Sequence, residues 1–275
     1  MDPSMLNTLR RSAEEAAQRA GRVLAERFSG ARTIEFKGGI DLVTDADKAS
    51  EAELLSFLRA RHPEHAVLAE ESGFSAASAS GGTGLRWIVD PLDGTTNYAH
   101  RVPHFCVSVA VDSPEGLLAG AIYEPLRGEL YSAARGQGAT LNGAPLRASS
   151  TAKLSQALVG TGFPYDVHER PEVPMGLLNQ FIPRARGIRR MGSAALDLAY
   201  VAGGRYDAFF ELGLKPWDIA AGALLMQEAG GVLTHVDGAP FTLARGDVLA
   251  CAPGIAAECQ QLAAGYLAQM RWQHR

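Results

Sequence analysis

One short apolar run that ends in two aspartates constrains this chain more than any other stretch. Residues 87–97 read WIVDPLDGTTN, so the run 87–89 suits a buried strand, and Asp90 and Asp93 follow directly. Pro91 has no backbone N–H to donate to a sheet, which predicts that the strand breaks after Asp90. A turn at that point would bring both carboxylates to one side, at the edge of the core.

Two carboxylates beside a core need a compensating positive charge. Like charges ~4 Å apart repel by about 4 kcal/mol at an effective dielectric of 20. Oxygen-only ligands suit Mg²⁺, which binds a few carboxylates, waters and substrate phosphate. Gly94 permits close approach of a ligand, and residues 95–97 are N-cap types that predict a helix start with free N–H groups. The segment therefore predicts metal-assisted phosphate chemistry.

Other acidic residues also stand at the ends of predicted elements. The strand in HAVLAEES ends in Glu70 and Glu71, either of which could be a ligand. Asp218 opens a helix after LKPW, and Asp47 lies at the start of the helix predicted from Ala46 to Arg61. Each could be only a helix cap, but acids at strand ends and helix starts can converge in a folded chain. We expect these acids to join Asp90 and Asp93.

The order of elements predicts a mixed α/β fold of one compact catalytic unit in two parts. Residues 1–150 form an α+β part, with a long amphipathic helix over 6–28, a strand over 33–36, a loop over 73–84, a meander over 105–133 and a hairpin at Asn142-Gly143. Residues 151–275 alternate strand and helix candidates, which predicts a second α/β layer set.

Composition and missing motifs exclude several classes of function. A net charge of −4 does not indicate nucleic acid or an anionic membrane as the main partner. Three scattered cysteines predict a reducing cytoplasm without a structural disulfide, and no apolar run reaches the ~20 residues of a membrane span. His62 and His65 are not expected to form a zinc pair, because Pro63 breaks the helix that would align them. Neither GxxxxGK[ST] nor GxSxG is present.

Several motifs, in order along nearly the whole chain, resemble the inositol monophosphatases, a family of lithium-sensitive, magnesium-dependent phosphatases. WIVDPLDGTTNYAH resembles the first signature of the family and KPWDIAAGALLMQEAGG the second. DLVTDADKASE, AEES and GSAALDLAYVAGGRYDAFFE fall in the family's order and spacing. GTGFPYD and GIRRMGSAALDLAY make the chain most similar to bacterial, SuhB-type members. The resemblance implies a layered αβαβα sandwich and a homodimer.

The resemblance also implies a set of metal ligands. Glu70, rather than Glu71, would hold one Mg²⁺ together with Asp90 and the backbone carbonyl of Leu92. Asp90, Asp93 and Asp218 would hold a second ion, and Glu70 would help to hold a weaker third one through water. Two to three ions per site are therefore expected.

The same resemblance implies the catalytic and substrate-binding residues. Thr95, paired with Asp47, would orient and deprotonate the attacking water, with Glu70 as a further catalytic residue. The amides of Gly94 and Thr95 would bind phosphate oxygens, near Asp93. The side of the site that faces the alcohol would comprise Ser193, Ala194, Glu211 and Asp218. Apart from the resemblance, Arg189 of the basic run over residues 184–190 could also reach this site.

The resemblance leaves the substrate and a second role open. Inositol monophosphate or a similar small polyol phosphate is expected, with fructose 1,6-bisphosphate, histidinol phosphate and nucleotide 3′-phosphate as alternatives. Similar bacterial proteins serve as partners of the transcription machinery. The basic run Arg184, Arg186, Arg189 and Arg190 could provide that contact, could lie at a subunit interface, or could be a solvated strand edge.

Overall fold

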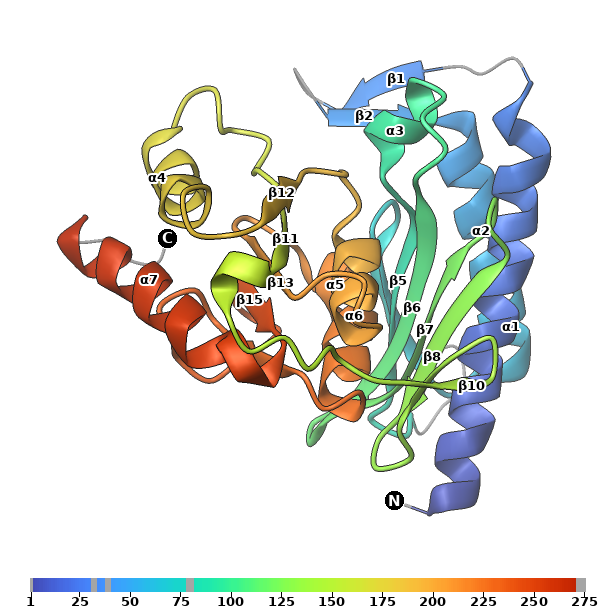
Figure 1. Cartoon of the computed structure of the whole chain (residues 1–275). Helices are drawn as coiled ribbons and strands as arrows, with labels where there is room; N and C mark the ends of the chain where they lie inside the picture. Colours follow the sequence, from blue (N-terminus) through green and yellow to red (C-terminus); the bar gives the residue numbers. More distant parts are fainter. Residues whose placement is uncertain (1, 31–33, 38–40, 78–81, 271–275) are drawn as a thin grey trace.

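Two large β-sheets, separated and covered by helices, make up the molecule. The structure is a computed structural model that describes residues 2–30, 34–37, 41–77 and 82–270. Within these ranges the strands form an eight-stranded sheet, a five-stranded sheet and a two-stranded hairpin. Figure 1 shows the large sheets side by side, with helices outside each of them and between them.

The eight-stranded sheet is a meander extended by one parallel pair. Its order is β10-β9-β8-β7-β6-β5-β3-β4, and only β3 and β5 run parallel. That parallel pair places the carboxyl ends of two neighbouring strands at the same edge of the sheet. The strands are β3 (Ala66–Ala69), β4 (Gly73–Ser75), β5 (Arg86–Asp93), β6 (Cys106–Ser113), β7 (Gly116–Glu124), β8 (Glu129–Ala134), β9 (Ala139–Leu141) and β10 (Ala144–Leu146).

Helices α1 (Pro3–Phe28) and α2 (Asp45–Arg61) cover the outer face of this sheet. The apolar stripe predicted for the first helix is buried against strands β6 and β7, and Gly21 allows the close approach, because a Cβ there would lie 2.5 Å from the Tyr123 ring. The hairpin of β1 (Ile34–Lys37) and β2 (Asp41–Thr44) joins the two helices.

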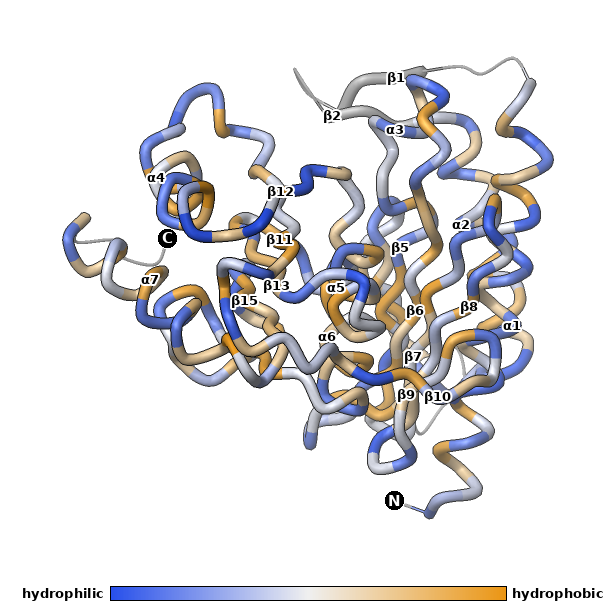
Figure 2. The backbone as a smooth tube through the Cα atoms, in the orientation of Figure 1, coloured by the Kyte–Doolittle hydropathy of each residue, from blue (hydrophilic) through white to orange (hydrophobic). Residues whose placement is uncertain are grey.

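Helices α5 (Ala194–Ala202) and α6 (Pro216–Glu228) fill the space between the two large sheets (Figure 1). They are hydrophobic on nearly all sides, as expected for helices buried on both faces, and Figure 2 shows the apolar colouring of this layer and of the central strands. Gly222 lets the helices meet, because a Cβ there would lie 2.5 Å from Leu198.

The five-stranded sheet has the order β12-β11-β13-β15-β14, with β11 parallel to both of its neighbours. Helices α4 (Glu172–Phe181) and α7 (Ala256–Gln269) cover its outer face. The layered αβαβα architecture is therefore confirmed. The strands are β11 (Leu158–Thr161), β12 (Gly187–Arg189), β13 (Ala208–Glu211), β14 (Val232–Thr234) and β15 (Val248–Cys251).

Most predicted elements are present, and most of their ends are displaced by one or two residues. The first helix begins three residues earlier than predicted, at Pro3, and the predicted loop 73–84 begins with strand β4. Residue 33, the first of the predicted strand 33–36, lies outside the described residues. Residues 78–81 of the predicted loop 73–84 also lie outside them. No helix among the described residues is long and apolar enough to cross a membrane. Cys106, Cys251 and Cys259 are buried free thiols.

Candidate active site

Four carboxylates converge at the carboxyl ends of β3 and β5. The parallel pairing of Ala69 with Val89 brings the next residues of the two strands, Glu70 and Asp90, side by side. Burial raises the pKa of Asp90 well above its usual range, and the charges of Glu70, Asp93 and Asp218 raise it further. We call these four residues the carboxylate cluster.

A bulge in β5, rather than a strand break, gives Asp90 and Asp93 their common direction. Asp90 pairs with Ser108 and Asp93 with Cys106, so β5 holds one residue more than β6 between these pairs. The prediction that the strand ends after Asp90 is therefore wrong. Pro91 is tolerated because a bulge does not require its missing N–H group.

Asp93 is held by donors from the second half of the chain. Its Oδ2 atom accepts hydrogen bonds from Ser193 Oγ at 2.6 Å and from the Ala195 backbone N–H at 2.8 Å. Cys106 Sγ, at 3.8 Å, donates to the same oxygen. Burial raises the pKa of Asp93, and these hydrogen bonds partly offset the rise. The hydroxyl of Ser193, predicted to face the substrate, is thus directed at Asp93.

Thr95 and Asp47 meet as the resemblance implies. Thr95 Oγ1 lies 3.2 Å from Asp47 Oδ1 and 3.0 Å from the carbonyl oxygen of Leu92. The other oxygen of Asp47 accepts hydrogen bonds from the N–H (2.8 Å) and the hydroxyl (2.5 Å) of Thr44 in the capping box of α2. Asp47 therefore caps its helix and reaches Thr95 at the same time.

Gly94 makes the turn between β5 and the short helix α3 (Thr95–Ala99). Its φ of 98° lies in the left-handed region that favours glycine. A Cβ atom there would also lie 3.1 Å from the carbonyl oxygen of His104. The predicted helix start is confirmed, but Gly94 is its N-cap residue, and no side chain of residues 95–97 makes a capping hydrogen bond.

Asp218 enters the carboxylate cluster from the first turn of α6. Its Oδ2 accepts a hydrogen bond of 2.7 Å from the Lys215 backbone N–H, so it also caps the helix. Burial, followed by the charge of Asp93, raises the pKa of Asp218 to about 8. The segment that precedes it is held by a hydrogen bond of 2.7 Å from the Leu214 N–H to the Gly246 carbonyl.

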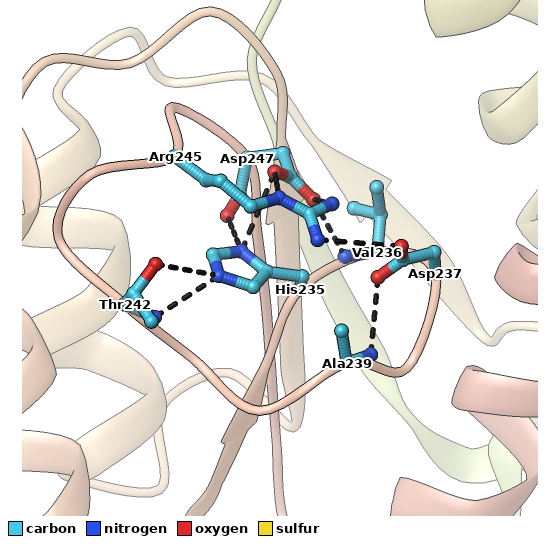
Figure 3. Close-up of polar contacts among 7 residues, drawn as sticks. All are labelled: His235, Val236, Asp237, Ala239, Thr242, Arg245 and Asp247. Atoms are coloured by element: carbon cyan, nitrogen blue, oxygen red, sulfur yellow. Dashed lines mark hydrogen bonds and ion pairs between the residues drawn. The ribbon is translucent and has the colours of Figure 1, made fainter. Parts of the chain in front are cut away.

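A polar clip of His235, Thr242, Arg245 and Asp247 lies in the loop between β14 and β15 (Figure 3). His235 Nδ1 lies 2.9 Å from the carbonyl oxygen of Asp247, and its Nε2 accepts the Thr242 N–H at 3.0 Å, which makes Nδ1 the protonated nitrogen. Arg245 donates to both carboxylate oxygens of Asp247, at 3.0 and 3.1 Å. The clip fixes the shape of the loop between β14 and β15, and the Gly246 carbonyl joins that loop to the segment that leads to Asp218.

Glu211, at the end of β13, lies in the same region as the carboxylate cluster. Burial raises its pKa to about 8; the charge of Arg190 opposes this rise and that of Asp93 adds to it. Gly162 leaves room for the side chain, since a Cβ there would lie 2.0 Å from Glu211 Oε2. Arg190, rather than Arg189, is therefore the arginine whose charge acts on Glu211.

The basic run is exposed on the protein surface. Arg184, Arg186, Arg189 and Arg190 are all exposed. The Arg189 guanidinium donates to the carbonyl oxygen of Ile188, its own neighbour, at 3.0 Å.

Three residues near the site could not be recognised as site residues from the sequence. Cys106 looks like an ordinary strand residue until the bulge places it against Asp93. Arg190 is one of several arginines in its run. Asp197 lies on the buried helix α5, where burial and then the charges of Glu211 and Asp93 raise its pKa well above the usual range. Only the tertiary structure distinguishes these residues from their neighbours.

Comparison with known proteins identifies the family to which this chain is similar. Residues 5–275 match the model of the inositol monophosphatase family. The chain is 41% identical over 245 residues to the Nus factor SuhB of Escherichia coli (strain K12), a match that covers 88% of this chain and 91% of the relative.

Solved structures agree with that match. The extragenic suppressor protein suhB of Bartonella henselae superposes with a TM-score of 0.86 at 36% identity, over 92% of this chain and 97% of the other. The inositol monophosphatase of Anabaena superposes with a TM-score of 0.85 at 40% identity, over 98% and 100% of the two chains.

Proposed function

Because the chain belongs to the inositol monophosphatase family, we propose that it is a Mg²⁺-dependent phosphomonoesterase acting on inositol monophosphate or a similar small polyol phosphate. The observation that carries this proposal is the convergence of the carboxylate cluster beside the Asp47–Thr95 pair. Such a cluster is unfavourable without cations, and a hydroxyl–carboxylate pair next to it can accept a proton from water.

The donor set of the cluster fits Mg²⁺. All its ligand atoms are oxygens. Burial raises the pKa of Asp90, and repulsion by the neighbouring carboxylates raises it further, which a cation would relieve. We assign one ion to Glu70, Asp90 and the Leu92 carbonyl, a second to Asp90, Asp93 and Asp218, and a weaker third to Glu70 through water. Bound Mg²⁺ would lower the pKa of a water molecule and neutralise charge on the phosphate and the leaving alkoxide.

The residues of the chain would position the water and the phosphate. The Thr95 hydroxyl, with Asp47 Oδ1 at 3.2 Å, can take a hydrogen bond from the attacking water while its own proton points to the carboxylate. The backbone amides of Gly94 and Thr95 would donate to phosphate oxygens. The carbonyl of Leu92 lies 3.0 Å from the Thr95 hydroxyl, which links this positioning to the bulge.

The polyol would bind on the side of Glu211. Its carboxylate is an acceptor for substrate hydroxyl groups, and Arg190 acts on it electrostatically. We retain Ala194 and Asp218 as contacts of the alcohol and Arg189 as a weaker candidate for this role. Ser193 is better explained as a residue that positions Asp93, because its hydroxyl donates to that carboxylate.

Replacing one ligand tests the assignment. Asp93→Asn preserves shape but removes the charge, and it should abolish phosphate release in Mg²⁺ while the circular dichroism spectrum stays native. Undiminished turnover by this variant would rule out the proposed site. A panel of inositol monophosphate, fructose 1,6-bisphosphate, histidinol phosphate and a nucleotide 3′-phosphate, each with and without Li⁺, would then identify the substrate class and test the lithium sensitivity that we expect.

We also propose a second, non-catalytic role as a cytoplasmic partner of the transcription machinery. The relative from Escherichia coli is named a Nus factor, and the basic run of this chain is exposed. A homodimer is the expected assembly, and its molar mass can be measured by light scattering.

Affinity capture from extract of the native cell tests the second role. The variant Arg184→Ala, Arg186→Ala, Arg189→Ala should lose transcription proteins. A matched variant, Arg11→Ala, Arg22→Ala, Arg59→Ala, removes three exposed arginines of α1 and α2 and should retain them. Equal recovery by the two variants would remove the basis for assigning this contact to the basic run.

A further inference from the structure

A second cluster of possible metal ligands lies in the turn between α2 and β3. α2 ends at Arg61, and the His65 N–H donates to the His62 carbonyl at 3.1 Å, which closes a turn through Pro63. The turn stacks the two imidazole rings, with centroids 4.7 Å apart and planes inclined by 10°. The expectation that these histidines cannot share an ion assumed a helix, and the turn removes that assumption.

Glu64 completes the group. Its Oε1 lies 3.1 Å from His65 Nε2 and 3.8 Å from His62 Nδ1, and one ligand atom from each residue lies within 4.8 Å of the other two. Ligands about 2.0–2.1 Å from a tetrahedral ion are roughly 3.3 Å apart, close to these separations. A rotation of one stacked ring about its Cβ–Cγ bond is needed to aim both nitrogen lone pairs at one point.

The surroundings suit neutral histidine ligands. Both rings are buried, and burial lowers the pKa of each, so the metal-binding neutral form prevails at neutral pH. Ser12 Oγ, 2.9 Å from His62 Nε2, can accept its proton, which leaves the lone pair on Nδ1. His65 Nδ1 is buried and has no hydrogen-bond partner among the described residues, so no hydrogen bond at this nitrogen opposes rotation of the ring. The half-exposed side chain of Glu64 leaves one side of the group open to solvent.

This group is separate from the carboxylate cluster. His65 directly precedes β3, and both rings contact Trp87 near the start of β5. Glu70 and Asp90 lie at the opposite ends of these two parallel strands; Glu70 follows His65 by five residues, about 16 Å at ~3.3 Å per residue. Two nitrogens and one oxygen also favour a different metal from an all-oxygen set.

We propose that His62, Glu64 and His65 bind a divalent transition-metal ion of the Zn²⁺, Ni²⁺ or Cu²⁺ type at a second, structural site. The bound ion joins the C-terminal end of α2 to the first residue before β3, and through Ser12 it also contacts α1. The ion therefore stabilises the packing of the two outer helices on the sheet, and it takes no part in phosphate release.

Copper electron paramagnetic resonance distinguishes the two sites, because only the histidine site supplies nitrogen ligands. Tag-free, metal-stripped protein with one equivalent of Cu²⁺ should show coupling to two imidazole nitrogens, and calorimetry should show one Zn²⁺ bound. His62→Gln should abolish the coupling, and Glu64→Gln should weaken Zn²⁺ binding at least tenfold. His168→Gln removes an exposed histidine that also lies beside a glutamate. This variant should leave the nitrogen coupling and the Zn²⁺ affinity unchanged.

Two outcomes would overturn the proposal. One is the absence of nitrogen coupling in the wild-type protein, and the other is an unchanged spectrum and Zn²⁺ affinity in both His62→Gln and Glu64→Gln. Glu64→Gln changes a half-exposed side chain and should fold normally, which thermal unfolding without metal will verify. Phosphate release in Mg²⁺ should be the same in all these proteins, so this test is independent of the proposed phosphatase activity.

Discussion

Ser193 donates a hydrogen bond of 2.6 Å to Oδ2 of Asp93, although the two residues are 100 positions apart in the chain. Asp93 ends a strand of the first sheet, and Ser193 is the N-cap residue of a helix between the sheets. The hydrogen bond therefore couples the orientation of a candidate metal ligand to the packing of the two halves. This contact and its neighbours lead to five predictions.

Loss of the Ser193 hydroxyl should impair metal binding more than folding. Ser193→Ala leaves Asp93 with fewer donors, and partners that orient a metal ligand typically contribute 10–100-fold in metal affinity or activity. We expect the Mg²⁺ concentration for half-maximal phosphate release to rise within that range. Ser155→Ala, at an exposed position, is the control and should match the wild type.

Thr95 should affect turnover and not substrate affinity. Thr95→Val removes the hydroxyl that lies 3.2 Å from Asp47, and general acid–base assistance contributes typically 10²–10⁴-fold. We expect kcat to fall by that amount with little change in KM. Thr95→Ser keeps the hydroxyl and should recover most of the activity; equal activity of the two variants would contradict the role assigned to this pair.

A methyl group at position 162 should disturb recognition of the polyol. The Cβ of Gly162→Ala would lie 2.0 Å from Glu211 Oε2, so the carboxylate must move. KM for a polyol phosphate should rise, whereas hydrolysis of an aryl phosphate that lacks hydroxyl groups should change little. Gly265→Ala, in α7 with open space around it, should affect neither substrate.

Mg²⁺ should stabilise the protein more at pH 8 than at pH 5.5. Asp218 and Glu211 have pKa values of about 8 in the metal-free fold. In an unfolded chain, the pKa of such carboxyl groups is about 4. The stability from these groups is therefore present at low pH and is lost as the pH rises from 4 to 8. In EDTA, the Tm should fall between pH 5.5 and pH 8, by roughly 2–4 °C for each kcal/mol of unfolding free energy lost. Addition of Mg²⁺ should restore the Tm at pH 8. A larger Mg²⁺ effect at pH 5.5 would contradict this account.

Breaking the His235 clip should weaken the site from a distance. His235→Ala removes the hydrogen bonds to Asp247 and Thr242, which loosens the loop whose Gly246 carbonyl holds Leu214. We expect a higher Mg²⁺ requirement and a lower Tm. His168→Ala, at an exposed histidine, is the control, and an unchanged Mg²⁺ requirement in His235→Ala would show that the clip does not support Asp218.

Local chemistry determined much of the fold and pointed to the acids of the site. The 3.6-residue repeat of α1, the helix start directly after Gly94 and the position of Asp218 after Pro216 are properties of short segments, so the sequence alone reveals them. The same holds for Asp90 and Asp93, because acids that follow a short apolar run can be recognised in the sequence.

Tertiary structure decided which atoms meet. The bulge that keeps Asp93 in β5 depends on pairing with β6, and the hydrogen bond from Ser193 depends on the packing of the two halves. The influence of Arg190 on Glu211 and the stacking of His62 on His65 arise in the same way. Contacts between residues far apart in the chain depend on register and side-chain volume across several layers, and no single segment encodes these.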